Sequence, residues 1–195
     1  MATKADRSEA TKSLIIEVAR KVFARDGYAA AALAEIVTEA NVTTGAVYHH
    51  FGGKKGLFIA VAEHLEQLIL DEVAESAPAA SSPWEAFENG LLGTLEICAR
   101  PDIQRIVFRD APNVVGLAEW REIEIKYAFG LMRNSIQALS SSGMIDAADP
   151  DLTAQILLGA IIEAAHGIAL SDDPDKALRD GRSVITKIAR AFKSS

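Results

Sequence analysis

The sequence predicts an all-α protein of about nine helices, in which a small N-terminal three-helix unit precedes a larger helical body. Two observations lead to this prediction. Apolar residues recur three and four positions apart along most of the chain, and no convincing run alternates with period two. The 195 residues also suit either one large domain or a module of about 50 residues followed by a body of roughly 130–140. We place the boundary between residues 1–53 and 54–195.

The first two helices follow from short apolar stripes. A stripe over 14–23 predicts a helix that stops at Gly27, a residue common just past helix ends. A second stripe predicts a helix over 33–40. Asn41 then tolerates a left-handed turn better than most residues. Tight connections therefore separate the three helices, one after Gly27 and one at Asn41.

The third helix, over 43–50, begins and ends on clear signals. Thr43 can cap its first turn. Val47 and Phe51, four residues apart, share its inner face, and Gly52-Gly53 end it. A long fourth helix follows over 54–75. The remaining helices come after a loop of small residues and prolines over 76–83, and we predict them at 84–99, 102–110, 117–140, 151–171 and 174–193.

Composition points to a reduced cytoplasmic protein. No stretch approaches the roughly 20 apolar residues of a membrane span, because Glu163 interrupts the longest candidate. The residues before Arg7 have no apolar segment of the kind found in secretion signals. Cys98 is the single cysteine, so it can form neither an internal disulfide nor a cysteine-based metal cluster. We expect no membrane association.

Charge is distributed unevenly along the chain. The net charge is −7, yet residues 1–60 carry eight Lys and Arg against six Asp and Glu, a net of +2, which leaves −9 on the rest. A basic end on an acidic body suits end-on binding to DNA, because attraction to phosphate is local and screened beyond about 10 Å. Eight positive charges in sixty residues are also common on an ordinary surface. Charge alone does not choose between the two interpretations.

The helices at 33–40 and 43–50, joined by a tight turn, form a helix-turn-helix pattern. The helix over 33–40 and the preceding helix bury their apolar stripes, so the helix over 43–50 protrudes from the surface. Such a helix must present side chains small enough to reach base edges in a major groove about 12 Å wide. An ordinary solvent-exposed helix would more naturally carry Glu, Lys and Gln. The non-core residues here are Thr43, Thr44, Gly45, Ala46, Tyr48, His49 and His50.

These residues carry a family resemblance. The order and spacing of Gly27-Tyr28, Ile36-Val37, Ala40 to Phe51 and Lys54 to Leu57 closely resemble the DNA-binding signature of the TetR family of bacterial regulators. The match covers about fifty residues, 11 to 60. It implies a one-component transcriptional regulator, most simply a repressor. Such a regulator binds an inverted-repeat operator in double-stranded DNA as a homodimer and is released by a small molecule.

The resemblance also implies roles for single residues. Thr43 would cap the recognition helix and contact phosphate or base, while Thr44, Gly45 and Ala46 would face base edges. Tyr48 and His49 would reach phosphates or bases, and Lys54 would bind phosphate.

Three departures from the pattern weaken the expected affinity. Ala29 to Ala32 lack the usual capping Ser or Thr, Thr44 stands where Lys or Arg is frequent, and Gly53 replaces a Ser or Asn cap. Each removes a phosphate contact or a cap that contributes about 0.5–2 kcal/mol.

The resemblance implies a ligand pocket in the helical body and pairing of the last two helices across a two-fold axis. The apolar bias of the inward faces suggests a small, uncharged or aromatic effector. Pocket candidates are Phe87, Phe108, Trp120, Tyr127, Met132 and His166. The last helix has an apolar stripe without an obvious partner, and a two-subunit four-helix bundle would bury it. Packing of the stripe within its own chain is the alternative. Interface candidates are Ile156, Gly159, Ala160, Ala164, Ile185, Ile188 and Phe192.

An enzymatic interpretation finds little support in the sequence. His49 and His50 point about 100° apart on a helix, so they cannot chelate one metal ion well. His166 stands three residues after Glu163, within reach of an intrahelical hydrogen bond. We find no catalytic constellation, and we expect no cofactor and no metal. The alternative is a helical small-molecule-binding or catalytic domain whose helix-turn-helix is degenerate.

Overall fold

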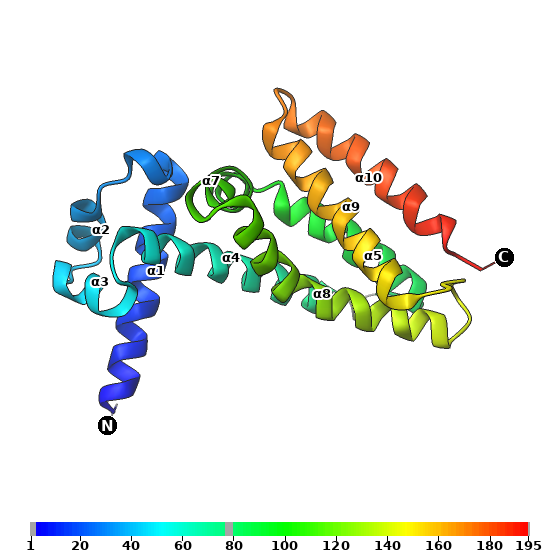
Figure 1. Cartoon of the computed structure of the whole chain (residues 1–195), viewed down its shortest axis with the longest axis horizontal. Coiled ribbons are helices and arrows are strands. Elements are labelled where there is room, and N and C mark those ends of the chain that lie inside the picture. Colours follow the sequence, from blue (N-terminus) through cyan, green and yellow to red (C-terminus); the bar gives the residue numbers. More distant parts are fainter. Residues whose placement is uncertain (1–2, 77–79, 195) are drawn as a thin grey trace.

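The computed structural model describes residues 3–76 and 80–194, and over these residues all the extended regular elements are helices, as predicted. Figure 1 shows the two termini at opposite ends of an elongated molecule. Part of the loop predicted over 76–83 falls on residues 77–79, outside the described residues. The helices are α1 (Lys4–Ala30), α2 (Leu33–Glu39), α3 (Thr44–Phe51), α4 (Lys54–Ser76), α5 (Pro83–Cys98), α6 (Pro101–Ile103), the π-helix η2 (Gln104–Asp110), α7 (Ala111–Val115), α8 (Leu117–Ser141), α9 (Pro150–Leu170) and α10 (Pro174–Ala191).

Helices α1, α2 and α3 form a small unit at one end of the molecule, closed by the first half of α4 (Figure 1). Its core is aromatic at the centre: the ring of Phe58 lies edge-on to Phe23 at 5.1 Å and to Tyr28 at 5.0 Å. The stop predicted at Gly27 is a kink in α1, where φ is +75° before helical turns continue to Ala30. This packing holds α2 and α3 against α1 and α4.

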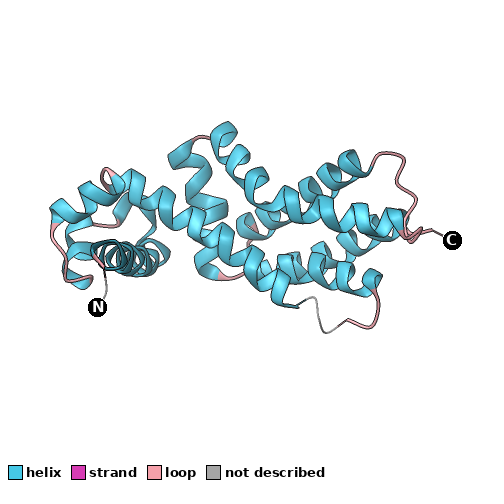
Figure 2. Cartoon of the chain, turned by 90° about the horizontal axis from the view of Figure 1, so that it is seen from below, coloured by secondary structure: helices cyan, strands magenta, loops and turns pink. Residues whose placement is uncertain are grey.

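Helix α4 belongs to both ends of the molecule. Its first half packs against α1 and α3, and its second half packs against α5 and α8 (Figure 2). The buried residues follow one stripe, with Leu57, Phe58 and Val61 in the small unit and Leu65 and Ile69 further along. One continuous rod therefore connects the small unit to the helical body.

The segment predicted as a helix over 102–110 is a short α-helix, α6, followed by seven residues of π-helix. Pro112 does not end a helix, because it occupies the first turn of α7, where the backbone N–H has no intrahelical partner to lose. π-Helices are rare and are frequently found at functional sites. Here η2 lies between α1 and α9 and contacts both.

Helices α5, α8, α9 and α10 make up the rest of the body (Figure 1). Helix α9 has the length and mean hydropathy, 1.5, of a membrane span, which the sequence analysis did not anticipate. Its residues Leu157, Ile161 and Ile168 are nevertheless buried against neighbouring helices, so α9 serves as a core helix of the bundle.

Candidate nucleic-acid interface and ligand cavity

The turn between α2 and α3 has the conformation that the sequence predicts. Asn41 adopts a left-handed φ of +50°, and the Val42 N–H donates to the carbonyl of Val37 at 3.1 Å. The hydroxyl of Thr43 then caps α3 by accepting a hydrogen bond from the Ala46 N–H at 3.2 Å. Ala32, at the start of α2, makes no side-chain cap, in line with the departure noted in the sequence. The helix-turn-helix is thus locally well defined.

Helix α3 turns one side to the core and the other to solvent. Val47 is fully buried and Phe51 packs against the same core cluster. Ala46 and His50 are partly covered. The exposed residues form one face of the helix and are Thr43, Thr44, Gly45, Tyr48 and His49. Among the described residues, no group of three or more His, Cys, Asp or Glu side chains could hold a metal ion.

The junction of α3 and α4 is held by close contacts. Gly52 ends α3 in a left-handed conformation, φ +72°. A side chain at Gly56 would overlap the carbonyl oxygen of Phe51, so only glycine lets α4 approach the end of α3 this closely. The Lys54 ammonium lies 4.7 Å from the centre of the Tyr28 ring and 3.4 Å from the Ala29 carbonyl oxygen. Lys54 is therefore held beside the C-terminal end of α1.

Three of the eight basic residues counted in residues 1–60 form ion pairs with acidic side chains, the first being Lys12, whose ammonium lies 3.8 Å from the Glu9 carboxylate. The Arg20 guanidinium donates to the Asp102 carboxylate of α6 at 2.6 Å. Arg25 makes 2.6 Å ion pairs with both Asp26 and Glu35. The positive charge available to an external partner is correspondingly smaller than the sequence count suggests.

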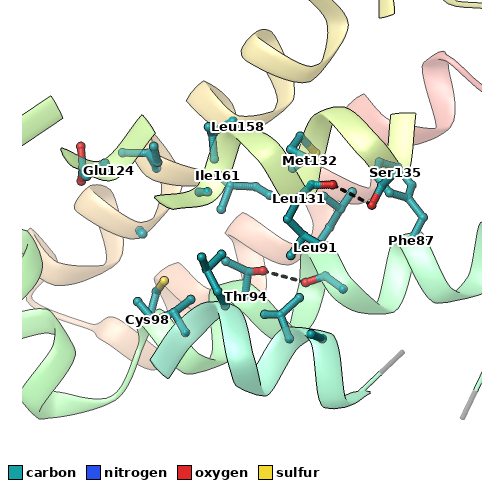
Figure 3. A pocket seen from close by; sticks show the side chains of 18 of the residues that line it. Phe87, Leu91, Thr94, Cys98, Glu124, Leu131, Met132, Ser135, Leu158 and Ile161 are labelled. Carbon is teal, nitrogen blue, oxygen red and sulfur yellow. Dashed lines mark hydrogen bonds between the residues drawn. The ribbon is translucent and has the colours of Figure 1, made fainter. Parts of the chain in front are cut away.

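A cavity of about 330 Å³ lies in the helical body, lined by α4, α5, α8, α9 and the π-helix (Figure 3). Its walls are mainly apolar, and Figure 3 shows Leu91, Leu158 and Ile161 facing it from α5 and α9. Glu124 and Ser135 lie toward opposite ends of this view. Eleven residues of α8 separate them, which at 1.5 Å per residue is about 16 Å. The space suits a small elongated molecule.

Three of the six predicted pocket residues, Phe87, Phe108 and Met132, line this cavity. The other three do not. Trp120 is fully buried in the core, and Tyr127 lies outside the lining with the Lys126 ammonium 5.2 Å from its ring centre.

His166 meets the ring of Phe108 edge-on at 5.1 Å and lines a separate surface groove. Its Nε2 lies 3.7 Å from a carboxylate oxygen of Glu124, and no hydrogen bond links it to Glu163, the partner that the sequence suggested. Burial lowers the pKa of His166.

Sequence reasoning missed two acidic residues in the cavity wall, Glu66 and Glu124, both buried. Burial raises the pKa of Glu66 to about 8, with a smaller contribution from Glu124, and burial raises the pKa of Glu124 to about 7. Burial likewise raises the pKa of the Cys98 thiol. A signal was available: Glu66 stands four residues after Ala62 and three before Ile69, in the register of the apolar stripe of α4.

The premise that the stripe of α10 lacks a partner is wrong. Ile185 is only 2% exposed, and Ile188 and Phe192 pack against the same core, which α5 and α9 of the same chain provide. The small residues predicted for the interface are also partly used within the chain: Ala160 and Ala164 pack against this core, and Gly159 lies beside the side chain of Arg121. Of the seven candidates, Ile156 is the most exposed, at 52%.

Comparison with known proteins identifies the class. Residues 15–61 match the family model of bacterial regulatory proteins of the tetR family, and residues 84–192 match the tetracyclin repressor-like C-terminal domain. The two matches cover both ends of the molecule, and the second spans more than half of the chain. The chain belongs to the TetR family and is a helix-turn-helix transcriptional regulator.

Two similar proteins match over nearly the full length of the chain, and a third matches over about two thirds of it. A TetR-family transcriptional regulator of Pectobacterium atrosepticum has a solved structure with a TM-score of 0.89 and 33% identity, covering 99% of this chain and 98% of that one. The Transposon Tn10 TetC protein of Escherichia coli is 27% identical, over 94% of this chain and 91% of its own. The HTH-type transcriptional repressor BepR of Brucella suis is 28% identical, over 67% and 68%.

Proposed function

We propose that this regulator binds an inverted-repeat operator as a two-fold dimer through the exposed face of α3, and that a small, largely apolar molecule in the cavity releases it. The observation that carries the DNA-binding half is the surface of α3. Thr43, Thr44 and Gly45 present little bulk at the N-terminal end of the helix, and Tyr48 and His49 follow with hydrogen-bonding groups. A helix of this kind can enter the major groove with its N-terminus first.

The side chain missing at Gly45 supports this docking. A Cβ there would have only the Thr43 hydroxyl oxygen within 4 Å, at 3.7 Å, so the packing of the chain does not require glycine. A glycine inside a helix also lowers stability relative to alanine. Close approach of the α3 backbone to DNA explains why glycine stands here.

We assign the dimer contact to the outer face of α9 and α10. Ile156 and Val184 are each 52% exposed, and Leu152 and Leu170 extend the apolar face along α9. Helices α9 and α10 lie on the outside of the bundle, away from α4 (Figure 1). A second copy placed on this face would bury apolar surface that one chain leaves in water, and a two-fold axis matches the symmetry of an inverted repeat.

The π-helix offers a route from the cavity to the DNA-binding unit. Phe108 lines the cavity. Two residues on, the Asp110 carboxylate accepts a hydrogen bond from the Tyr28 N–H at 2.7 Å, beside the kink of α1. Arg105, on the same helix, donates to the Asp26 carbonyl at 3.2 Å. A ligand that displaces Phe108 would move the groups that hold the end of α1, and with it the position of α3.

Footprinting of the purified protein on DNA that flanks its own gene tests the DNA-binding half. We expect protection of two half-sites related by symmetry, with centres about 34–36 Å apart or slightly more if the duplex bends. A footprint over one asymmetric half-site would contradict the dimeric docking. Addition of a molecule that fills the cavity should remove the protection, whereas a bound ligand that leaves it unchanged would contradict the release.

A further inference from the structure

The wall of the cavity contains a carboxyl group with no partner. Glu66 is 7% exposed, and among residues 3–76 and 80–194 it has no hydrogen bond and no ion pair. The titratable groups that face it are Glu124 of α8, Cys98 of α5 and Tyr127 of α8, none of which is a cation. Burial of an unpaired carboxyl group is unfavourable, so its position calls for a reason beyond packing.

A second carboxyl group shares the cavity. Glu124 is also buried, and one of its oxygens lacks a hydrogen bond. The Arg121 guanidinium lies 3.9 Å from one Glu124 oxygen and the His166 Nε2 lies 3.7 Å from the other, and both residues are outside the cavity lining. Arg121 and the Trp120 indole oppose the rise in the pKa of Glu124 without cancelling it.

We propose that the effector is an amphiphilic cation, whose positive charge lies against Glu66 and Glu124 and whose apolar body extends along α8 toward Ser135. This inference rests on the proposed function of the cavity as the effector site. It replaces the uncharged ligand that apolar composition suggested. The described lining residues include two carboxyl groups but no Lys, Arg or His, so the cavity holds two acidic groups and its lining provides no cation to pair with them.

The rest of the lining selects the body of the ligand. Leu91, Leu131, Leu158 and Ile161 offer apolar surface over most of the wall. Two hydroxyl groups that face the cavity are already bonded within their helices, since Thr94 donates to the Gly90 carbonyl and Ser135 to the Leu131 carbonyl (Figure 3). The carboxyl groups are therefore the strongest polar anchors available, and they lie away from the Ser135 end.

The elevated pKa values make a specific demand on the ligand. Near neutral pH, Glu66 is largely protonated and Glu124 is partly protonated in the empty protein. A cation would favour the ionised form of both, so its binding should release protons. Affinity for a cation should then rise with pH from 6 toward 8 and level off above the pKa of Glu66, whereas affinity for a neutral molecule should not.

Two isosteric probes separate charge from shape. Equilibrium dialysis of the full-length protein would compare N-methylquinolinium, a permanent cation, with neutral 1-methylnaphthalene. We expect the cation to bind at least tenfold more tightly at pH 8 and to lose most of that preference at pH 6. The double variant Glu66→Gln, Glu124→Gln should bind both probes about equally. Glu63→Gln, one turn away on α4 and outside the lining, is the matched control and should keep the wild-type preference.

The outcomes separate the two proposals. Equal or weaker binding of the cation by the wild-type protein, or a preference that survives in the double variant, would overturn the cationic ligand and leave the cavity as a sensor of neutral molecules. Binding of neither probe would overturn the cavity itself as an effector site. The wild-type pH series needs no variant, so the test holds even if the double variant folds poorly.

Discussion

Replacing Gly45 with alanine should make the protein more stable and a weaker DNA binder. The added methyl group meets no atom of the chain closer than 3.7 Å, so the fold accepts it. A glycine-to-alanine change at a compatible position stabilises by about 0.4–1 kcal/mol. At about 2–4 °C per kcal/mol for a chain of this size, the melting temperature should rise by about 1–4 °C.

The same methyl group should interfere with DNA twice, because a dimer presents two α3 helices. Overpacking by one methyl group costs about 1–3 kcal/mol per contact. Even about 1 kcal/mol at each half-site would lower operator affinity by about thirtyfold. Calorimetry would give the melting temperature, and fluorescence anisotropy with a labelled operator would give the affinity.

Gly130→Ala supplies the control for this experiment. Gly130 is exposed on α8, far from α3, and a Cβ there would meet nothing within 4 Å. This variant should gain similar stability and keep full operator affinity. A stabilised Gly45→Ala protein with unchanged affinity would refute close approach of the α3 backbone to DNA. A lower melting temperature would instead show that the fold itself requires glycine.

Three further predictions concern the charges and the interface. Lys54→Ala should flatten the slope of log affinity against log salt by about 1.8 for a dimer, since each phosphate contact contributes about 0.9. The control Lys55→Ala, at the neighbouring exposed lysine, should change this slope less. The same slope in both variants would argue against a special role for Lys54. Ile156→Asp combined with Val184→Asp should give a folded monomer in sedimentation. The control Ile185→Asp should instead unfold the chain, because it places a charge in the core. A folded dimer of the double variant would exclude the outer face of α9 and α10 as the dimer contact. Folding raises the pKa of Glu66 from 4.5 to about 8, so the free energy of unfolding should be highest below pH 4.5 and should fall between pH 4.5 and about 8, where the unfolded chain has lost the Glu66 proton and the folded chain still holds it. Chemical denaturation from pH 5 to 9 should show this decline in the wild type and a smaller one in Glu66→Gln.

The elements that sequence predicted well are those set by local chemistry. Thr43 caps α3, Asn41 takes the left-handed turn and Gly52 ends the helix, because each conformation depends on the residue and its immediate neighbours. The inward positions of Val47 and Phe58 likewise follow from helical spacing. Local signals were sufficient for α2, α3 and the turn between them, but not for the end of α1, which continues past Gly27 to Ala30.

The features that sequence predicted poorly depend on long-range packing. The stripe of α10 reads the same whether it faces another subunit or α5 and α9 of its own chain, and only the tertiary arrangement decides between them. Trp120 and Phe108 are equally apolar in sequence, yet one fills the core and the other faces the cavity. The π-helix also leaves no periodic signal in the sequence. A turn of π-helix contains about one residue more than a turn of α-helix, and a segment of seven residues is too short for this difference to change the spacing of apolar residues.

The unbroken α4 imposes a rule on anyone who would exchange sensor domains between such regulators. One end of this helix fits the small unit at Gly56, and the other end contributes Glu66 and Ile69 to the cavity wall. Each residue inserted or deleted between them would turn the cavity by about 100° and shift it by about 1.5 Å relative to α3. A chimaera joined inside α4 therefore has to keep the parental number of residues, or change it by seven, so that the cavity keeps its rotation about the helix axis relative to α3.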